Sequence, residues 1–380
     1  MKVAHISPSF FPARVYGGPT ESIYQTCLAT AAGGCNVRVL TTNANGRDQV
    51  LQVSVNREMP MGERLTVRYS ARQAGESMST DFLRRLHSYI EWADVVHLEA
   101  VYSFPTIPTL WVAGRLRKPI VWSSRGALAR WKGARRPHLK SIYDSLCRLT
   151  RGDRVTFHFT SEPEREASLQ RFPGLEGVVI PNGVHCPDEA NPGQRGETLR
   201  LLYLGRLDPI KGIENLLEAC GRLNGSLKGK WRLTLAGAGD PSYTATLKAS
   251  IDRLGLTNLV HLVGSVAGEE KERCFATADL VVVPSHLENF CIVVAEALAH
   301  GVPVVASRGT PWPRLESEGC GLWVENDPAT LARAIERISA MPLAEMGKKG
   351  RAWMRSDFTW SRVGAQMIQL YQRLAERNPA

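Results

Sequence analysis

Residues 279–296 read DLVVVPSHLENFCIVVAE, and this stretch decides the fold that the rest of the chain is expected to adopt. The apolar run Leu280–Val283 is typical of a strand buried on both faces. A helix is expected from about residue 292 to residue 300, and a second strand at 302–306. The order strand, turn, helix, strand is the repeat of a parallel α/β sheet. In such sheets ligands bind beyond the carboxyl ends of the strands, so the turn at 284–291 is the first place to look for a site.

Two carboxylates, Glu288 and Glu296, flank this turn. Their spacing of eight residues is weak evidence, because the pairs 91/99 and 189/197 have it too, and ordinary surface acids are an equal alternative. Their position carries more weight. The start of a helix offers free N–H groups and a positive dipole end, which favour a phosphate. The hypothesis is that the two glutamates and the amides between them hold a nucleotide-sugar.

The composition indicates a globular protein of two domains. The chain has 380 residues, which exceeds what one hydrophobic core usually supports. It contains 43% hydrophobic and 22% charged residues, and no apolar run long enough to span a membrane. The N-terminus leads directly into a predicted strand without the shape of a signal peptide, so a cytoplasmic location is expected. The eight cysteines are scattered and are expected to be reduced thiols.

Strands and helices alternate along both halves of the chain, which predicts an α/β protein with two Rossmann-like, doubly wound parallel-sheet domains facing each other across a cleft. The first domain is expected at 1–185, a linker rich in proline and glycine at 186–198, and the second domain at 199–360. A last helix at about 361–376 could return to the first domain. Thr20 is the predicted N-cap of the first helix.

Basic residues dominate 115–140, where the sequence has no acidic residue. Three tryptophans, Trp111, Trp122 and Trp131, lie within or just before this stretch. Tryptophan together with Lys and Arg favours an anionic membrane surface, and a diphosphate is a second possible partner. A solvated basic face is the alternative. No recognised nucleic-acid-binding motif accompanies the net charge of +10, so nucleic acid is not an expected partner.

Two cations follow the first strand of the second half. Arg206 comes directly after Leu199–Leu204 and Gly205, and Lys211 precedes the next predicted helix. Fixed cations there could neutralise the diphosphate that leaves when a sugar departs from a nucleotide. A strand–helix turn with charges facing solvent is the alternative.

Several short motifs combine with these residues. They are Gly17-Gly18, the stretches 180–184 (IPNGV) and 204–207 (LGRL), Lys211-Gly212, and the stretches 235–239 (LAGAG), 283–285 (VPS) and 296–306 (EALAHGVPVVA). Together they resemble the retaining glycosyltransferases of family 4, also described as glycosyl transferase group 1, which have the two-domain GT-B fold. The match covers nearly the whole chain and is strongest from Leu199 to Leu322.

The resemblance implies roles for particular residues. Arg206 and Lys211 would bind the donor diphosphate, Glu296 the ribose, and Glu288 the transferred sugar. The glycines would let the first loop approach the diphosphate closely. The implied donor-binding set is Gly17, Gly18, Arg206, Lys211, Glu288, Asn289, Phe290, Cys291, Ile292 and Glu296. The implied catalytic set is Glu288, Arg206, Lys211 and Arg125.

The chain departs from the family pattern at Arg125, which stands where many relatives have a histidine. Arginine cannot act as a general base at neutral pH, although it could bind sugar hydroxyls or phosphate. Residues 101–108 and 124–126 resemble a subgroup found in bacterial surface-polysaccharide assembly. The acceptor-binding candidates are His97, Glu99, Tyr102 and Arg125. For His97, packing at the end of a strand is the stronger alternative.

The resemblance therefore implies retaining transfer of a hexose-type sugar from a UDP- or GDP-sugar to a glycan, expected to be linked to a lipid diphosphate at the inner face of the cytoplasmic membrane. The chain has no Asp-x-Asp, so neither a metal nor a cofactor is expected. An epimerase of the same fold and a non-catalytic scaffold that binds sugar nucleotides remain alternatives. A nicotinamide oxidoreductase is disfavoured, because Ser242 replaces the third glycine of the dinucleotide fingerprint.

Overall fold

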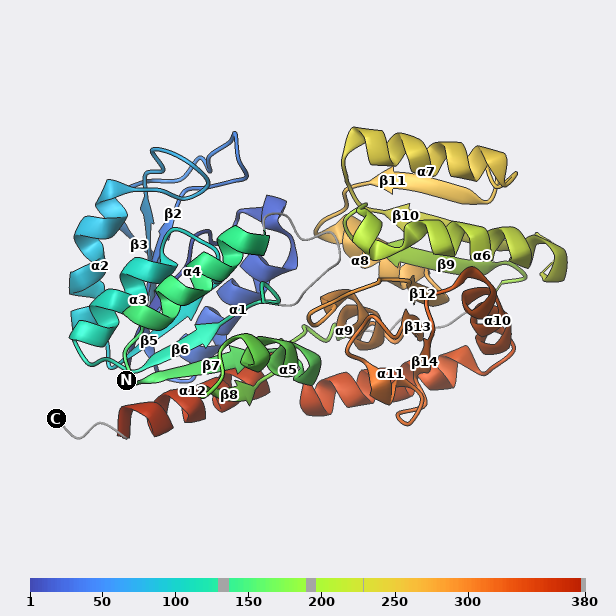
Figure 1. The fold of residues 1–380 in the computed structure, drawn as a ribbon. Helices are drawn as coiled ribbons and strands as arrows, with labels where there is room; N and C mark the ends of the chain where they lie inside the picture. The colour runs from blue at the N-terminus through green and yellow to red at the C-terminus, as the bar shows by residue number, and fades with distance from the viewer. Residues whose placement is uncertain (129–136, 189–195, 228, 377–380) are drawn as a thin grey trace. The chain divides into compact units, whose positions relative to one another are not determined.

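The computed structural model describes residues 1–128, 137–188, 196–227 and 229–376, which form two compact units (Figure 1). Unit 1 contains Met1–Gly183 and the C-terminal segment from Trp360, and unit 2 contains Val184–Thr359. Each unit is an α/β domain around one sheet, so the predicted fold class of two Rossmann-like domains is confirmed. Residues 189–195 of the expected linker lie outside the described residues. Among the described helices, none has the length and apolar character needed to cross a membrane.

The sheet of unit 1 has eight strands in the order β3-β4-β2-β1-β5-β6-β7-β8. Every neighbouring pair is parallel except β3 and β4, which are antiparallel. The strands are β1 (Lys2–Ile6), β2 (Asn36–Thr42), β3 (Glu58–Gly62), β4 (Leu65–Ser70), β5 (Val95–Glu99), β6 (Ile120–Ser123), β7 (Val155–Phe159) and β8 (Glu176–Val179).

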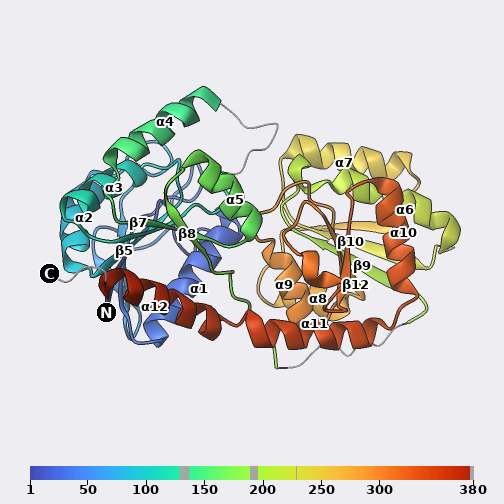
Figure 2. The same ribbon diagram turned by 60° about the horizontal axis from the view of Figure 1, so that its bottom comes forward.

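Helices cover both faces of this sheet (Figure 2). One core cluster joins the sheet to α1 (Gly18–Ala32) and α12 (Trp360–Glu376), and another joins it to α2 (Thr80–Trp92), α3 (Thr106–Arg115) and α4 (Pro137–Thr150). A ten-residue helix, α5 (Glu162–Arg171), connects β7 to β8. The last helix packs closely on α1, because a Cβ at Gly364 would lie only 2.8 Å from the Cβ of Ala29.

Unit 2 has a parallel sheet in the order β11-β10-β9-β12-β13-β14. Its strands are β9 (Leu199–Leu204), β10 (Trp231–Ala236), β11 (Val260–Gly264), β12 (Leu280–Val283), β13 (Val304–Ser307) and β14 (Gly321–Val324). Its helices are α6 (Ile213–Ser226), α7 (Pro241–Arg253), α8 (Glu269–Thr277), α9 (Ile292–Ala299), α10 (Pro328–Ser339) and α11 (Leu343–Asp357).

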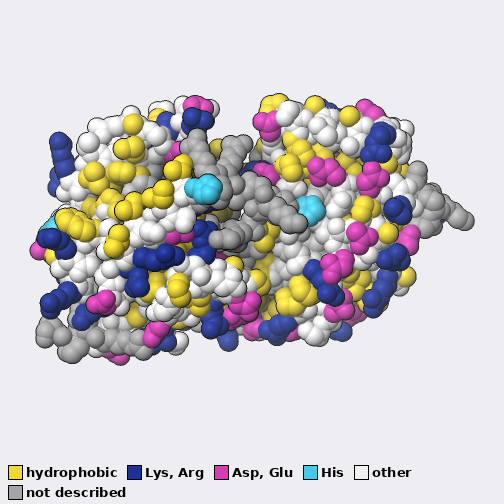
Figure 3. Space-filling model, viewed as in Figure 1, with side chains coloured by type: hydrophobic (Ala, Val, Ile, Leu, Met, Phe, Trp, Pro, Cys, Tyr) yellow, Lys and Arg dark blue, Asp and Glu magenta, His cyan; other side chains and the backbone are white. Residues whose placement is uncertain are grey.

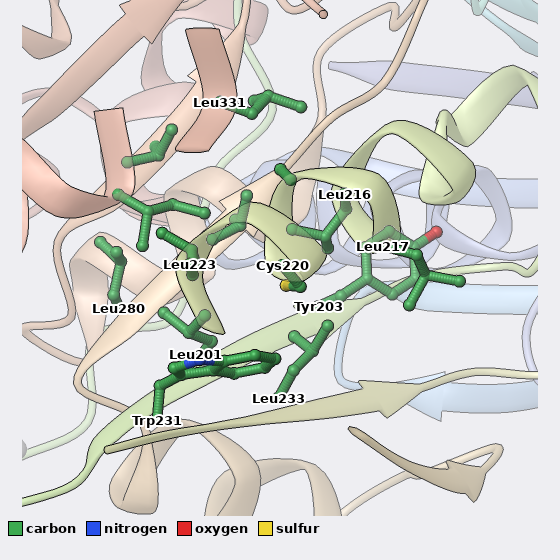
Figure 4. Close-up of a cluster of buried hydrophobic side chains, with 14 of the residues drawn as sticks. Leu201, Tyr203, Leu216, Leu217, Cys220, Leu223, Trp231, Leu233, Leu280 and Leu331 are labelled. Carbon is green, nitrogen blue, oxygen red and sulfur yellow. The ribbon is translucent and has the colours of Figure 1, made fainter. Parts of the chain in front are cut away.

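Side chains alternate between two cores along the central strands of unit 2, as expected for a sheet covered on both faces. Leu201 and Tyr203 of β9 point into the cluster formed with α6 and α10, where Trp231 is fully buried (Figure 4). Leu202 points to the opposite cluster, which includes α9 and α11. This layering fixes the carboxyl ends of β9 and β12 side by side.

Two local predictions are wrong. Thr20 is not an N-cap: α1 begins earlier, with Gly17 as N-cap at φ 74°, a left-handed value that suits glycine. The Thr20 hydroxyl instead donates to the carbonyls of Ala13 and Gly17. Trp122, expected beside the basic residues, is fully buried on β6 and stacks on Phe157. It therefore cannot contribute to a surface, whereas Trp111 is half exposed.

Candidate functional site

The loop after β9 presents two cations in different environments. Arg206 extends into solvent, with its side chain 64% exposed and its Nε 3.6 Å from the carboxylate of Asp208. Asp208 caps the short 3₁₀ helix Pro209–Lys211 by accepting from the N–H of Ile210. Gly212 then takes a left-handed conformation at φ 62°, and a Cβ there would meet the carbonyl of Pro284 at 2.2 Å. This close contact holds the end of the Lys211 turn against the end of β12.

Lys211 and Glu288 meet at these strand ends. The Nζ of Lys211 lies 2.6 Å from Oε1 of Glu288, and the hydroxyl of Ser285 donates to the same oxygen at 2.8 Å. The backbone N–H of Glu288 donates to the carbonyl of Gly309. Both charged side chains are mostly buried, so their pairing is less screened than that of a surface pair. The structure thus brings together two residues predicted from separate motifs.

The turn between Glu288 and α9 is held in an uncommon conformation. Cys291, the N-cap of α9, has φ 63° and ψ 67°, which costs a non-glycine residue about 1–2 kcal/mol. Its neighbour Phe290 is buried, and the Phe290 carbonyl accepts from Nε1 of Trp312 at 2.6 Å. Burial, followed by the charge of Glu288, raises the pKa of the Cys291 thiol well above its usual value. The thiol is therefore protonated. The N-terminus of α9 separately offers backbone amides at this turn.

Glu296 lies on α9, one turn beyond its start. Its Oε1 accepts from Nζ of Lys271 at 2.5 Å, and Lys271 belongs to α8. His300 joins the same group, since its Nδ1 donates to the carbonyl of Glu296 and its Nε2 lies 2.6 Å from Glu272. Each of the two predicted glutamates is therefore paired with a lysine from a different part of unit 2.

The glycines after β9 and β10 have a structural reason. A Cβ at Gly237 would lie 1.8 Å from the carbonyl of Gly205, and a Cβ at Gly239 would lie 2.1 Å from the carbonyl of Leu207. Only glycine lets the two loops run this close together, which keeps Arg206 at a fixed place beyond the sheet.

In unit 1, Arg125 is buried in a polar network. It bonds both oxygens of Glu99, at 2.7 and 2.9 Å, and donates to the side-chain oxygen of Asn182 at 3.0 Å. Nε2 of His5 lies 2.9 Å from Glu99. Burial alone would raise the pKa of Glu99, but Arg125 and then His97 hold it well below its usual range. Arg125 and Glu99 are therefore a buried ion pair.

A chain of hydrogen bonds lies next to this ion pair. The positions of the protons in the chain follow from the backbone carbonyl at one of its ends. The carbonyl of Ile180 can only accept, so Nε2 of His158 donates to it at 2.9 Å. Nδ1 of His158 then accepts from the hydroxyl of Ser123, which accepts from His97, which accepts from Tyr371. Burial is the main cause that lowers the pKa of His97 well below 6.5 and that of His158 to about 4, so both rings are neutral at neutral pH.

This placement corrects the acceptor-site hypothesis for two residues. His97 and Glu99 have no exposed surface, because β5 is the centre of the sheet and α12 covers this face. They cannot touch an acceptor as they lie, and Glu99 holds Arg125 in place. His5, His97 and Glu99 also have the mutual spacing of a metal site, with their ligand atoms within 4.8 Å of one another. The guanidinium of Arg125 already neutralises the carboxylate there, which does not fit a cation.

The remaining predicted residues of unit 1 lie elsewhere. Tyr102 is partly exposed, and its hydroxyl donates to Asp144, which pairs with Arg171. Gly17 and Gly18 form the start of α1, and space around Gly17 is open. In the basic stretch, residues 129–136 lie outside the described part of the chain.

The residues of these groups that were not predicted include Ser285, Lys271 and Glu164. Ser285 and Lys271 serve Glu288 and Glu296, and Glu164 binds the loop that carries Arg125 by accepting from the hydroxyl of Ser124 and the N–H of Gly126, both at 2.6 Å. Ser161-x-x-Glu164 is a capping-box pattern, which could have identified Glu164 as a residue bound to backbone amides. Ser285 follows β12 in the motif 283–285, which the sequence already singled out. For Lys271 the sequence holds no signal.

The sequence of this chain matches two family models and is similar to several known proteins. Residues 188–353 match the family model described as glycosyl transferases group 1, and residues 17–183 match a glycosyl transferase 4-like domain. A glycogen synthase of Mycobacterium tuberculosis is 28% identical over 97% of this chain and 94% of its own. A D-inositol 3-phosphate glycosyltransferase of Geodermatophilus obscurus is 30% identical over 59% of this chain, but this alignment spans only 50% of that protein.

Solved structures share the fold across the whole chain. Sucrose-phosphate synthase from Thermosynechococcus elongatus is 23% identical and superimposes with a TM-score of 0.77, covering 100% of both chains. HepE from Anabaena, solved in complex with UDP, is 18% identical with a TM-score of 0.72, covering 98% of this chain and 100% of its own.

Proposed function

This chain belongs to the group 1 glycosyltransferases with a 4-like N-terminal domain, and we propose that it transfers a hexose-type sugar from a UDP- or GDP-sugar to a glycan with retention of configuration. The observation that carries the proposal is the Lys211–Glu288 pair at the carboxyl ends of β9 and β12. Exposed Arg206 and the N-terminus of α9 lie at the same strand ends.

The pair suggests how the donor binds. Without a ligand, Glu288 neutralises Lys211. A donor diphosphate can take Lys211 as a partner together with Arg206, which releases the carboxylate of Glu288 to accept from sugar hydroxyls. The paired Glu296 and Lys271 can exchange in the same way, with Glu296 accepting from the ribose. The exchange at the first pair would leave Lys211 with an anionic partner and Glu288 with hydrogen-bond donors, so neither buried charge would be left without a polar partner.

The reaction itself is a substitution at the anomeric carbon. The acceptor hydroxyl forms the new C–O bond, the bond to the diphosphate breaks, and the proton passes to the leaving phosphate oxygen on the same face. Arg206 and Lys211 stabilise the negative charge that develops on the diphosphate. Within this proposal Arg125 acts as a positioning residue, because its guanidinium is already committed to Glu99 and Asn182.

The acceptor we propose is a glycan linked to a lipid diphosphate, as in the assembly of bacterial surface polysaccharides, with the protein at the inner face of the cytoplasmic membrane. The relatives include a D-inositol 3-phosphate glycosyltransferase and a glycogen synthase, which do not point to one common acceptor. The support for a lipid-linked acceptor is the excess of basic residues at 115–140, where the sequence has no acidic residue.

Thermal shift with a panel of UDP-, GDP-, ADP- and dTDP-sugars tests donor binding. We expect a UDP- or GDP-sugar to raise the Tm of the wild type, because a ligand that binds only the folded state stabilises it. Lys211→Ala should weaken this ligand about a hundredfold, since a charge-assisted contact contributes up to about 3 kcal/mol. Lys230→Ala, which removes an exposed lysine paired with exposed Glu197, is the matched control and should bind as the wild type. If both variants showed the same donor-induced thermal shift, the assignment of Lys211 to the donor site would be wrong.

Transfer is expected to be independent of metal. Arg206, Lys211 and the helix N-terminus supply the positive charge in this proposal, and Glu288 and Glu296 are both paired with lysines. The rate in excess EDTA should equal the rate without it. Loss of activity that magnesium restores would contradict the expectation.

A further inference from the structure

Helix α4 has an apolar face that none of the described residues of unit 1 covers. Leu139, Ile142, Leu146 and Leu149, the α4 stripe, are spaced by three, four and three residues, which places them along one side of a helix. Their exposed fractions are 57, 59, 44 and 81%. Figure 3 shows hydrophobic side chains gathering along this helix on the visible face of unit 1. Single exposed leucines are ordinary, but four aliphatic side chains aligned on one helix mark an interaction surface.

The stripe is separate from the packing of the helix. Cys147 of α4 is buried and Tyr143 is partly buried, and both pack against the core shared with α2 and α3. One side of α4 therefore packs against the core of unit 1, and the stripe is a second apolar face. Exposed aliphatic side chains that take no part in this packing indicate that the stripe contacts a partner.

The exposed or partly exposed Lys and Arg residues of α3 and α4 give this part of unit 1 a net positive charge. Lys140 and Arg148 belong to α4, and exposed Arg115 ends α3. The one acidic residue of α4, Asp144, is buried and paired with Arg171, so it does not offset these charges at the surface. Half-exposed Trp111 lies on α3 with the guanidinium of Arg115 4.9 Å from its ring. Leucine, tryptophan and basic side chains together are the composition of helices that lie in the interface of an anionic bilayer.

We propose that the α4 stripe docks unit 1 on an anionic membrane surface, with the leucines at the level of the acyl chains and the basic residues at the headgroups. A second copy of the chain is a weaker candidate, because a stable protein interface takes about 20–30 residues from each side. A bilayer requires only one amphipathic helix face. The inference extends the proposed lipid-linked acceptor, but binding to vesicles needs no turnover, so each can fail without the other.

Flotation of the full chain with vesicles tests the proposal. The wild type should float with vesicles of equal parts phosphatidylcholine and phosphatidylglycerol, and much less with phosphatidylcholine alone. Binding should fall in concentrated salt, which screens the basic residues. Ile142→Gln/Leu149→Gln should reduce partitioning by at least about tenfold, since both changes remove aliphatic area from the membrane contact. Glutamine keeps the helix propensity, so the fold and the donor-induced thermal shift should be unchanged.

Val263→Gln is the matched control, because Val263 is 50% exposed but lies on β11 of unit 2. It should float as the wild type does. The proposal is overturned if the wild type fails to float with the anionic vesicles, or if the double variant floats equally well. A wild-type dimer in solution that the double variant abolishes, without any flotation, would assign the stripe to a second copy.

Discussion

Replacing Glu288 with glutamine should lower the turnover of the nucleotide-sugar about a hundredfold without raising the KM for the donor. The carboxylate is expected to accept from hydroxyls of the transferred sugar, and a hydrogen bond to a charged group contributes up to about 3 kcal/mol. The same carboxylate lies 2.6 Å from Nζ of Lys211 in the unliganded protein. Glutamine frees that ammonium, so binding of the diphosphate should be unchanged or stronger while kcat falls.

This split between kcat and KM distinguishes a role in the reaction from a structural role. Glu325→Gln is the matched control, because Glu325 lies on the surface of unit 2, beside exposed Arg308. Its kinetic constants should equal those of the wild type. A Glu288→Gln variant that keeps full turnover would contradict the assignment, and one with an equally large loss of donor affinity would show that the pair with Lys211 does not compete with the donor.

Replacing Glu99 with alanine should lower the free energy of unfolding by about 3–5 kcal/mol, because the change leaves the buried guanidinium of Arg125 without its charged partner. Urea denaturation at neutral pH measures this loss. The loss of pairing also predicts the pH dependence. Because Arg125 and then His97 hold the pKa of Glu99 low against the effect of burial, its contribution to stability is present above the pKa of an unfolded glutamate and is lost as the pH falls.

The double variant Glu99→Ala/Arg125→Ala should lose less than the sum of the two single variants, since removing both charges leaves none unpaired. Glu91→Ala provides the control: Glu91 is exposed on α2 beside His87, and its loss should change stability by less than about 0.5 kcal/mol. Additive effects of the Glu99 and Arg125 changes would contradict the ion pair.

The sequence predicted the elements whose patterns are strong and local. The strands Asn36–Thr42, Leu199–Leu204 and Leu280–Val283 were predicted with the bounds that the structure has, because apolar and β-branched residues dominate each of them. The start of α1, in contrast, was predicted at the wrong residue. The helix begins where Gly17 allows a positive φ, and a preference for threonine as N-cap is weaker than this backbone requirement.

The partners of the site residues were harder to predict, because they depend on which strand ends meet. Lys211 and Glu288 were both identified, but their direct contact requires β9 and β12 to be neighbours in the sheet. Arg125 and Glu99 follow the same rule in unit 1. Glu99 pairs with Ser123 in the register of β5 and β6, which brings Arg125 to the carboxylate. When this register is not known, the sequence suggests that Arg125 lies on the surface, whereas in the structure it is buried.

Trp122 is a second residue for which the sequence suggested the surface and the structure shows burial. Its place among basic residues suggested a membrane surface, but the apolar pattern of 120–123 is that of a central strand, and the strand decides its burial. The surface residues that do suggest a membrane, the α4 stripe, appear only when the helix is packed and one of its two apolar faces is left uncovered.

Release of nucleoside diphosphate from UDP- and GDP-sugars, followed by NMR without added acceptor, tests the central claim most directly. A glycosyltransferase that binds its donor at Lys211 and Glu288 should release the diphosphate slowly with water as acceptor. Glu288→Ala should abolish this release, while Glu325→Ala should retain it. Conversion of the donor into an epimer without diphosphate release, or binding of the donor with no turnover at all, would contradict the account.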